Sequence, residues 1–140
     1  MQAWIAICIG ACAGALLRWQ LSVWGNGLAA LPLGTLGANW LGGYLIGICV
    51  GVFEAMPELD PQWRLLLVTG FLGALTTFST FSAEVVGMLQ QSRLALAAGT
   101  AALHLMGSLA LTWLGLKTVD RKSTRLNSSH MSESRMPSSA

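Results

Sequence analysis

Charged residues are scarce in this chain of 140 residues: they make up 10% of it, whereas 54% of the residues are hydrophobic and the mean hydropathy is +0.60. In a water-soluble domain about a quarter of the residues are normally charged. A membrane-spanning helix needs about 20 apolar residues, and the charge-free runs are 1–17, 19–53, 65–83 and 94–116. We therefore predict an all-α membrane protein whose four spanning helices lie near 3–24, 33–53, 64–90 and 94–116.

Little of the chain remains outside these spans. That shortage excludes a separate soluble catalytic, nucleotide-binding or nucleic-acid-binding domain, so the partner of most of the surface is the lipid bilayer. No nucleophile with a neighbouring base and no metal-binding triad is present, and we expect no enzyme activity. The cysteines, Cys8, Cys12 and Cys49, fall within apolar spans and are interpreted as small packing residues.

The last part of the chain has a different composition. From Asp120 onward it reads DRKSTRLNSSHMSESRMPSSA, which back-translates into a sequence resembling a common sequencing-library adapter. We predict that residues 120–140 are a non-native, disordered tail and that 1–119 form a single four-helix domain. Lys and Arg balance Asp and Glu within 1–119, so the formal net charge of +2 comes from the tail.

Charge and glycine patterns both bear on assembly. With four spans, two natural cations fall on each side of the membrane, so the positive-inside rule selects no orientation and insertion both ways is plausible. Glycines repeat every fourth residue at Gly10 and Gly14, and at Gly43, Gly47 and Gly51. Such faces let helices approach closely, either within one subunit or between two. Because four helices make a thin bundle for any pore or carrier, we favour a dimer.

Polar side chains inside the spans are costly in lipid and therefore informative. Arg18 could serve a structural or anchoring role by extending its guanidinium to the interface. Asn39 lies too deep to do so, which leaves a helix-to-helix hydrogen bond or a pore contact. Glu84 is the only carboxylate within a span. It could relay protons or accept hydrogen bonds from a neighbouring helix.

The third span carries the densest polar segment, GFLGALTTFSTFSAE at 70–84. Its glycines and hydroxyls make a poor continuous helix, and we predict a break at about 73–80. Exposed carbonyls at such a break can hold a cation. Phe78 and Phe81 are three residues apart and would share a helical face. They are either core residues or an aromatic pair whose positive ring edges contact an unhydrated anion.

In the fourth span, His104, Ser108 and Thr112 recur every fourth residue and form a polar stripe. The stripe is either a hydrogen-bonding track for something small or a set of groups satisfied by neighbouring helices. A lone histidine without a second suitably spaced ligand does not indicate a metal site.

These motifs together resemble the Fluc/CrcB family of fluoride ion channels. The resemblance covers essentially all of 1–119 and rests on the TTFSTFS run above all. The matching residues are Gly14-x-x-x-Arg18, Gly34-Thr35, Asn39-x-x-Gly42, Gly73-x-x-Thr76-Thr77-Phe78-Ser79-Thr80-Phe81-Ser82 with Glu84, and Gly107-Ser108 with Thr112.

The resemblance implies an antiparallel, dual-topology homodimer in the bacterial inner membrane, with two pores that release toxic fluoride passively. It also implies a structural sodium ion at the dimer centre, bound by backbone carbonyls of Gly73 and Thr76. The residues implied for the fluoride pathway are Asn39, Phe78, Phe81, Ser82, Ser108 and Thr112. Those implied to support it are Arg18, Thr80, Glu84 and His104. The alternative is a small dual-topology exporter of multiple drugs or cations, although such carriers bind cations at a carboxylate in the first helix, where this chain has none.

Overall fold

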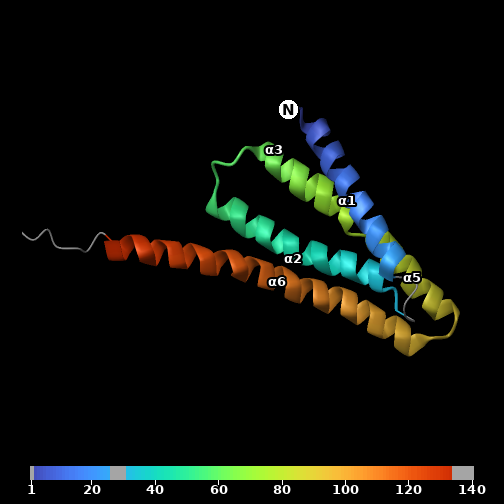
Figure 1. Ribbon diagram of the computed structural model, residues 1–140. Coiled ribbons are helices and arrows are strands. Elements are labelled where there is room, and N and C mark those ends of the chain that lie inside the picture. The colour runs from blue at the N-terminus through green and yellow to red at the C-terminus, as the bar shows by residue number, and fades with distance from the viewer. Residues whose placement is uncertain (1, 26–30, 134–140) are drawn as a thin grey trace, which may run out of the picture.

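The computed structural model describes residues 2–25 and 31–133, and the regular elements in these ranges are all helical (Figure 1). In chain order they are α1 Ala3–Gly25, α2 Leu33–Ala55, α3 Pro61–Arg64, the π-helix η1 Leu65–Leu72, α4 Gly73–Leu75, α5 Phe78–Gln90 and α6 Leu94–Glu133. The described residues contain four helical segments long and apolar enough to cross a membrane, and the third runs from Pro61 to Gln90. The prediction of an all-helical chain with four apolar spans is confirmed.

Local chemistry explains where the third segment begins and where it turns into the fourth. The Asp60 side chain accepts a hydrogen bond from the Gln62 N–H at 2.9 Å and caps α3, with Pro61 in the first turn. Between α5 and α6, Ser92 adopts a φ of 57° in the left-handed region. The Arg93 N–H donates to the Met88 carbonyl at 2.9 Å and closes this turn. The tight turn makes α5 and α6 antiparallel neighbours.

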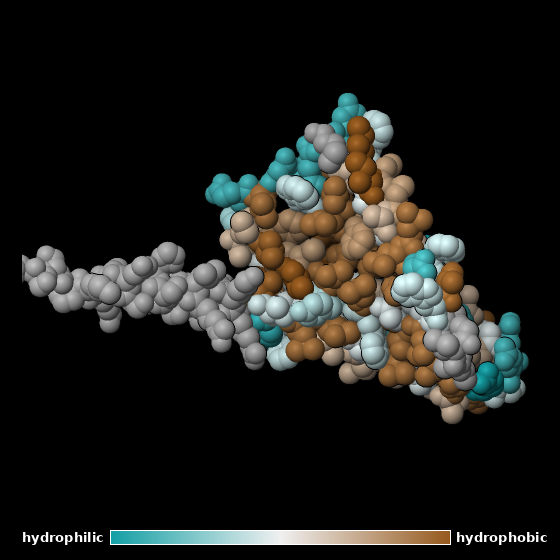
Figure 2. Space-filling view, in the orientation of Figure 1, coloured by the Kyte–Doolittle hydropathy of each residue, from teal (hydrophilic) through white to brown (hydrophobic). Residues whose placement is uncertain are grey.

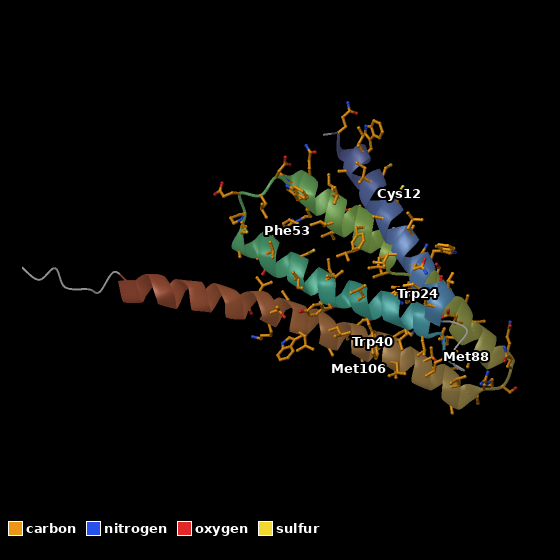
Figure 3. All side chains as sticks on the ribbon, viewed as in Figure 1. Cys12, Trp24, Trp40, Phe53, Met88 and Met106 are labelled. Atoms are coloured by element: carbon orange, nitrogen blue, oxygen red, sulfur yellow. The ribbon has the colours of Figure 1, made fainter. Side chains whose placement is uncertain are left out.

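The helices pack in two main pairs. α2 and α6 lie side by side along much of their length, while α1 packs against η1 and α4 (Figure 1). Ala38, Leu72 and Leu75 form the buried core between these elements. Trp40 lies where α2 meets α6 (Figure 3), and its indole N–H donates to the Leu103 carbonyl at 3.0 Å.

The surface fits a lipid environment. Figure 2 shows apolar side chains over the middle of the molecule and hydrophilic ones gathered towards its two ends. Four tryptophans near the ends of the apolar segments are more than half exposed, namely Trp4, Trp24, Trp63 and Trp113. Amphipathic indole rings prefer the headgroup region of a bilayer, so these side chains suit anchors at the membrane interface.

Glycine permits close backbone contact within the subunit. A Cβ on Gly14 would overlap the Phe71 carbonyl oxygen, and one on Gly47 would overlap the Thr112 carbonyl oxygen. Gly10 lies equally close to the Leu66 carbonyl. Of the two interpretations of the glycine runs, packing between helices of one subunit therefore accounts for these positions.

The third segment is irregular in two places. Leu65–Leu72 forms a π-helix, which we did not predict. Beyond α4, Thr76 and Thr77 adopt extended backbone, with φ/ψ of −79°/151° and −147°/111°. The last helical bond before them runs from the Thr76 N–H to the Leu72 carbonyl at 3.0 Å. These two residues lie within the segment 73–80 and separate α4 from α5.

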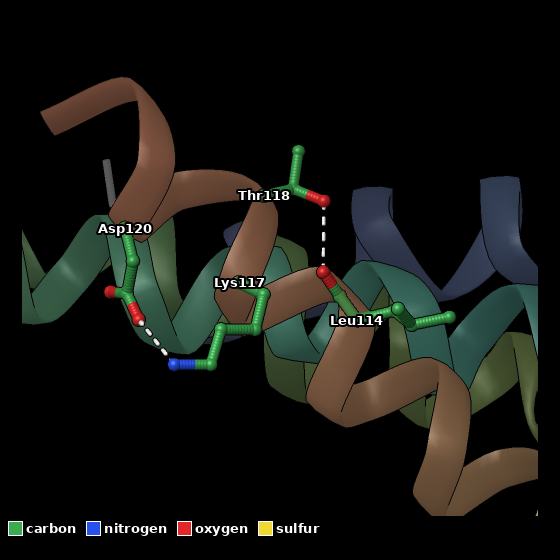
Figure 4. Close-up of polar contacts among 4 residues, drawn as sticks. All are labelled: Leu114, Lys117, Thr118 and Asp120. Carbon is green, nitrogen blue, oxygen red and sulfur yellow. Dashed lines mark hydrogen bonds and ion pairs between the residues drawn. The ribbon is translucent and has the colours of Figure 1, made fainter. Parts of the chain in front are cut away.

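The structure differs from our prediction at the start of the tail. Disorder was predicted for 120–140, but α6 continues as a helix to Glu133, and 134–140 lie outside the described residues. Near residue 120, Lys117 pairs with Asp120 at 3.9 Å and the Thr118 hydroxyl donates to the Leu114 carbonyl at 2.8 Å (Figure 4). Extending an existing helix avoids the unfavourable nucleation step, which explains how a segment without apolar periodicity can continue it. The non-native origin of 120–140 stays a prediction.

Candidate functional site

A cavity of about 520 Å³ lies where α2, the third segment and α6 meet. It is lined by eight of the residues singled out in the sequence, namely Asn39, Gly73, Thr76, Phe78, Phe81, His104, Ser108 and Thr112. The described residues that line it include no Asp, Glu, Lys or Arg. Four other predicted residues, Arg18, Thr80, Ser82 and Glu84, are not among the lining residues. The cavity is thus a mostly apolar space with a few convergent polar groups, as is typical of small-ligand sites.

Asn39 joins three elements at this cavity. Its Oδ1 accepts a hydrogen bond from the Thr77 N–H at 2.7 Å, and its Nδ2 donates to the Thr77 carbonyl at 3.1 Å. Nδ2 also lies 3.1 Å from His104 Nδ1 on α6. The Asn39 carboxamide oxygen therefore gives the Thr77 N–H the acceptor that it lacks because the backbone is extended here. The helix-to-helix hydrogen bond is present, and the same residue lines the cavity.

The aromatic side chains form a short stack beside Asn39. The ring centroids of Phe78 and Phe81 are 5.6 Å apart with an interplanar angle of 59°. Phe81 in turn lies 4.6 Å from the His104 ring, at 32°. Phe78 is 79% exposed, so within this subunit it is not a core residue. Tilted rings of this kind present their positively polarised edges to the space around them.

The hydroxyl groups differ in whether their hydrogen atoms are already used. The Thr112 hydroxyl is within hydrogen-bonding distance of the Gly43 carbonyl at 2.9 Å and the Ser108 carbonyl at 2.8 Å. The Ser82 hydroxyl donates to the Phe78 carbonyl at 2.8 Å. The Ser108 hydroxyl makes no hydrogen bond to another described residue and is available to a ligand.

Thr77 is a functional candidate that our sequence reasoning did not single out. It is 6% exposed, and its hydroxyl oxygen accepts from the Thr80 N–H at 3.2 Å, which caps α5. The same hydroxyl donates to Thr80 Oγ1 at 2.9 Å. Threonine is a common N-cap residue, because its hydroxyl oxygen can accept from an N–H in the first turn of the helix. This segment contains five hydroxyl residues, so the preference alone does not show which of them caps α5.

Glu84 and Arg18 lie away from the cavity lining. The Thr35 hydroxyl donates to Glu84 Oε1 at 2.6 Å, whereas the buried Glu84 Oε2 has no hydrogen-bond partner among the described residues. Thr35 itself is 1% exposed. Glu84 thus accepts a hydrogen bond from a neighbouring helix, one of its two predicted roles. Arg18 is half-buried on α1 and pairs with no other described residue.

The carbonyl oxygens of Gly73 and Thr76 lack their usual helical donors. In a helix each would accept from the N–H four residues later. The Thr77 N–H instead donates to Asn39, and the Thr80 N–H donates to the Thr77 hydroxyl. Hard cations such as sodium prefer oxygen ligands of this kind. The described residues contain no cluster of His, Cys, Asp and Glu side chains that could hold a metal ion. Backbone oxygens are therefore the groups that fit a cation here.

Comparison with known proteins identifies one family. Residues 5–116 match the family described as "CrcB-like protein, Camphor Resistance (CrcB)". A fluoride-specific ion channel FluC of Albidiferax ferrireducens is 70% identical over 114 residues, which cover 81% of this chain and 88% of that protein. FluC of Paracidovorax citrulli is 59% identical over 112 residues, covering 80% and 89%. FluC of Pseudomonas aeruginosa is 56% identical over 113 residues, covering 80% and 89%.

Proposed function

This chain belongs to the CrcB family, and on that premise we propose that it is a fluoride channel that lets the toxic anion leave the cell down its electrochemical gradient. It is a multi-pass membrane protein and not an enzyme. Its relatives come from bacteria, which supports a location in the bacterial inner membrane. The observation that carries the proposal is the 70% identity to a fluoride-specific channel over 88% of that protein's length. The same finding argues against the multidrug exporter alternative.

The cavity offers weak contacts that suit rapid passage of a small anion. A fixed cation would hold fluoride tightly, and the described lining residues include none. The edges of Phe78 and Phe81 and the free Ser108 hydroxyl instead supply partial positive charge. Conduction requires binding that is favourable enough for entry and weak enough for exit. We propose that fluoride passes these groups after shedding most of its water.

We propose that the channel is an antiparallel homodimer with two pores. Two features of one subunit support this arrangement. The natural charges of 1–119 are balanced, which permits insertion in both orientations. Phe78, which lines the cavity, is 79% exposed, and a second subunit would cover it. A pore wall completed by a partner also explains how so thin a bundle encloses an anion.

A structural sodium ion at the dimer centre is the further part of this proposal. The Gly73 and Thr76 carbonyl oxygens would hold it, because their helical donors are engaged elsewhere. A sodium ion bound by these carbonyls would supply positive charge that offsets their dipoles. Asn39 and the Thr77 hydroxyl keep those carbonyls free by occupying the Thr77 and Thr80 N–H groups.

The direct test is anion efflux from liposomes that contain the purified full chain. Under equal outward gradients we expect a fluoride electrode to record rapid loss, while a chloride electrode records none beyond that of protein-free liposomes. Membrane insertion is checked independently by protease protection. If the protein is folded and inserted but fluoride stays inside, the channel proposal is wrong.

Removal of sodium gives a second prediction. Prolonged exchange into potassium buffer of equal ionic strength should weaken the dimer and slow fluoride efflux. At a sodium concentration about 100 times the dissociation constant, the lost stabilisation is about 2.7 kcal/mol. Dimer content is measured by chemical crosslinking and flux by the fluoride electrode, and returning sodium should restore both. Unchanged crosslinking and unchanged efflux after long depletion would contradict the sodium site.

A further inference from the structure

The hydrogen bonds of Asn39 determine which atom of its carboxamide is which. A backbone N–H can only donate, so the atom that lies 2.7 Å from the Thr77 nitrogen must be the carboxamide oxygen. The other terminal atom is then the NH₂ group, which can only donate. Its two hydrogens have two acceptors, the Thr77 carbonyl and His104 Nδ1, each at 3.1 Å.

This assignment extends to the imidazole of His104. Because the Asn39 NH₂ group must donate, His104 Nδ1 must accept, and an accepting ring nitrogen carries no proton. A neutral imidazole with a bare Nδ1 has its proton on Nε2. Nε2 is buried and has no hydrogen-bond partner among the described residues. One oriented N–H donor at the junction of α2, α5 and α6 is therefore left without an acceptor in the described part of the chain.

We propose that Asn39 is a positioning residue that selects the Nε2–H tautomer of His104 and, through that ring, sets the orientation of Phe81. Both Asn39 N–H groups are already used, so Asn39 acts on the cavity through His104 rather than as a free donor. The His104 ring lies 4.6 Å from Phe81, and Phe81 lies 5.6 Å from Phe78. The order of influence is thus Asn39, His104 and then the aromatic pair. This inference deepens the proposed function and rests on it: the tautomer of His104 affects fluoride passage only if the protein is a fluoride channel.

The surroundings of His104 leave Asn39 in control of the tautomer. His104 is 5% exposed, so bulk water does not compete for Nδ1. Among the described residues, Asn39 from α2 hydrogen-bonds with the ring and Phe81 from α5 stacks against it, and neither is charged. Glu84, the carboxylate of α5, accepts from Thr35 and forms no ion pair with His104. A buried N–H without an acceptor costs about 1–3 kcal/mol, which an arriving acceptor such as fluoride would relieve.

The tautomer can be measured without any ion flux. The chain has two histidines, His104 and His130, so full-length protein carrying His130→Gln and labelled with ¹⁵N-histidine reports His104 alone. At a pH where imidazole is neutral, the ¹⁵N shifts and N–H couplings distinguish a protonated from a bare nitrogen. We expect protonated Nε2 and bare Nδ1. In Asn39→Asp, a carboxylate that cannot donate should accept from His104, so Nδ1 should become protonated.

A matched variant separates this effect from general disturbance of the junction. Thr35 lies one helical turn before Asn39 on α2 and contacts Glu84, not His104. Thr35→Val should therefore keep protonated Nε2 and bare Nδ1. Protonated Nδ1 in the parent protein, or an unchanged Nε2–H tautomer in a folded Asn39→Asp, would overturn the proposal. The parent measurement stands even if Asn39→Asp fails to fold. If the ¹⁵N measurements give the expected tautomers but liposomes with the folded protein release no fluoride, the channel function is overturned and the role of Asn39 in selecting the tautomer is retained.

Discussion

Phe81→Ile is expected to lower fluoride efflux at least tenfold while leaving the helical bundle folded. Phe81 lies between two other rings, with centroid distances of 5.6 Å to Phe78 and 4.6 Å to His104. Isoleucine fills similar space but has no ring quadrupole, so the partial positive edge and both aromatic contacts are lost. Each aromatic contact is worth about 0.5–1.5 kcal/mol, and about 1.4 kcal/mol corresponds to a factor of ten. The measurement is initial fluoride efflux per reconstituted protein.

Phe53→Ile is the matched control for this substitution. Phe53 lies near the end of α2, where the Arg64 guanidinium sits 5.2 Å from its ring centroid, and it is not among the lining residues of the cavity. The same chemical change there should leave efflux close to that of the parent. Equal efflux from folded Phe81→Ile and the parent would remove Phe81 from the pathway, and equal losses in both variants would indicate a general defect.

Gly47→Ala is expected to cause a large loss of stability for a single added methyl group. A Cβ at this position would overlap the Thr112 carbonyl oxygen and lie 3.0 Å from the Leu116 nitrogen. Both atoms belong to the backbone of α6, so a side chain cannot move aside. Overpacking typically costs about 1–3 kcal/mol, and the helices here have to separate. Separation would also draw Asn39 away from His104, so we expect a lower unfolding temperature together with slower fluoride efflux.

Gly37→Ala tests whether this effect depends on position. Gly37 lies on the same helix, and a Cβ there would meet nothing within 4 Å apart from the neighbouring backbone of its own helix. Alanine also favours a helix over glycine by about 1 kcal/mol, so Gly37→Ala should retain or raise the unfolding temperature. Thermal unfolding in detergent and efflux in liposomes are measured for both variants. A Gly47→Ala protein as stable as Gly37→Ala would show that α2 and α6 are not in backbone contact at this point.

Some features of the site were accessible from local sequence because they depend on residue type. Asn39, the Phe78 and Phe81 pair and the stripe containing His104 stood out as polar or paired aromatic groups within apolar runs. The structure places all four around one cavity. Their contacts were not accessible in the same way. The Asn39 partners are 38 and 65 residues away along the chain, and no periodicity relates them.

Other features escaped prediction for identifiable reasons. Thr77 was hidden among neighbouring hydroxyl residues, because its role depends on extended backbone that only the packed helices impose. The π-helix Leu65–Leu72 lies in an apolar run whose sequence resembles any spanning helix. The Thr35 and Glu84 pair joins residues 49 apart. The start of the tail was expected to be disordered from its composition, but α6 continues through it to Glu133.

The sequence by itself established an all-helical chain, four apolar spans and the polar residues that such spans carry at a cost, because hydropathy and side-chain chemistry are local properties. Tertiary structure alone established how those polar groups are shared. It assigned both Asn39 N–H groups to Thr77 and His104, and it gave the helical donors of the Gly73 and Thr76 carbonyls to other acceptors. It also left the Ser108 hydroxyl and His104 Nε2 without a partner among the described residues. The physical reason is that each donor hydrogen in the bilayer goes to one acceptor, and which acceptor is within reach depends on the packing of distant helices.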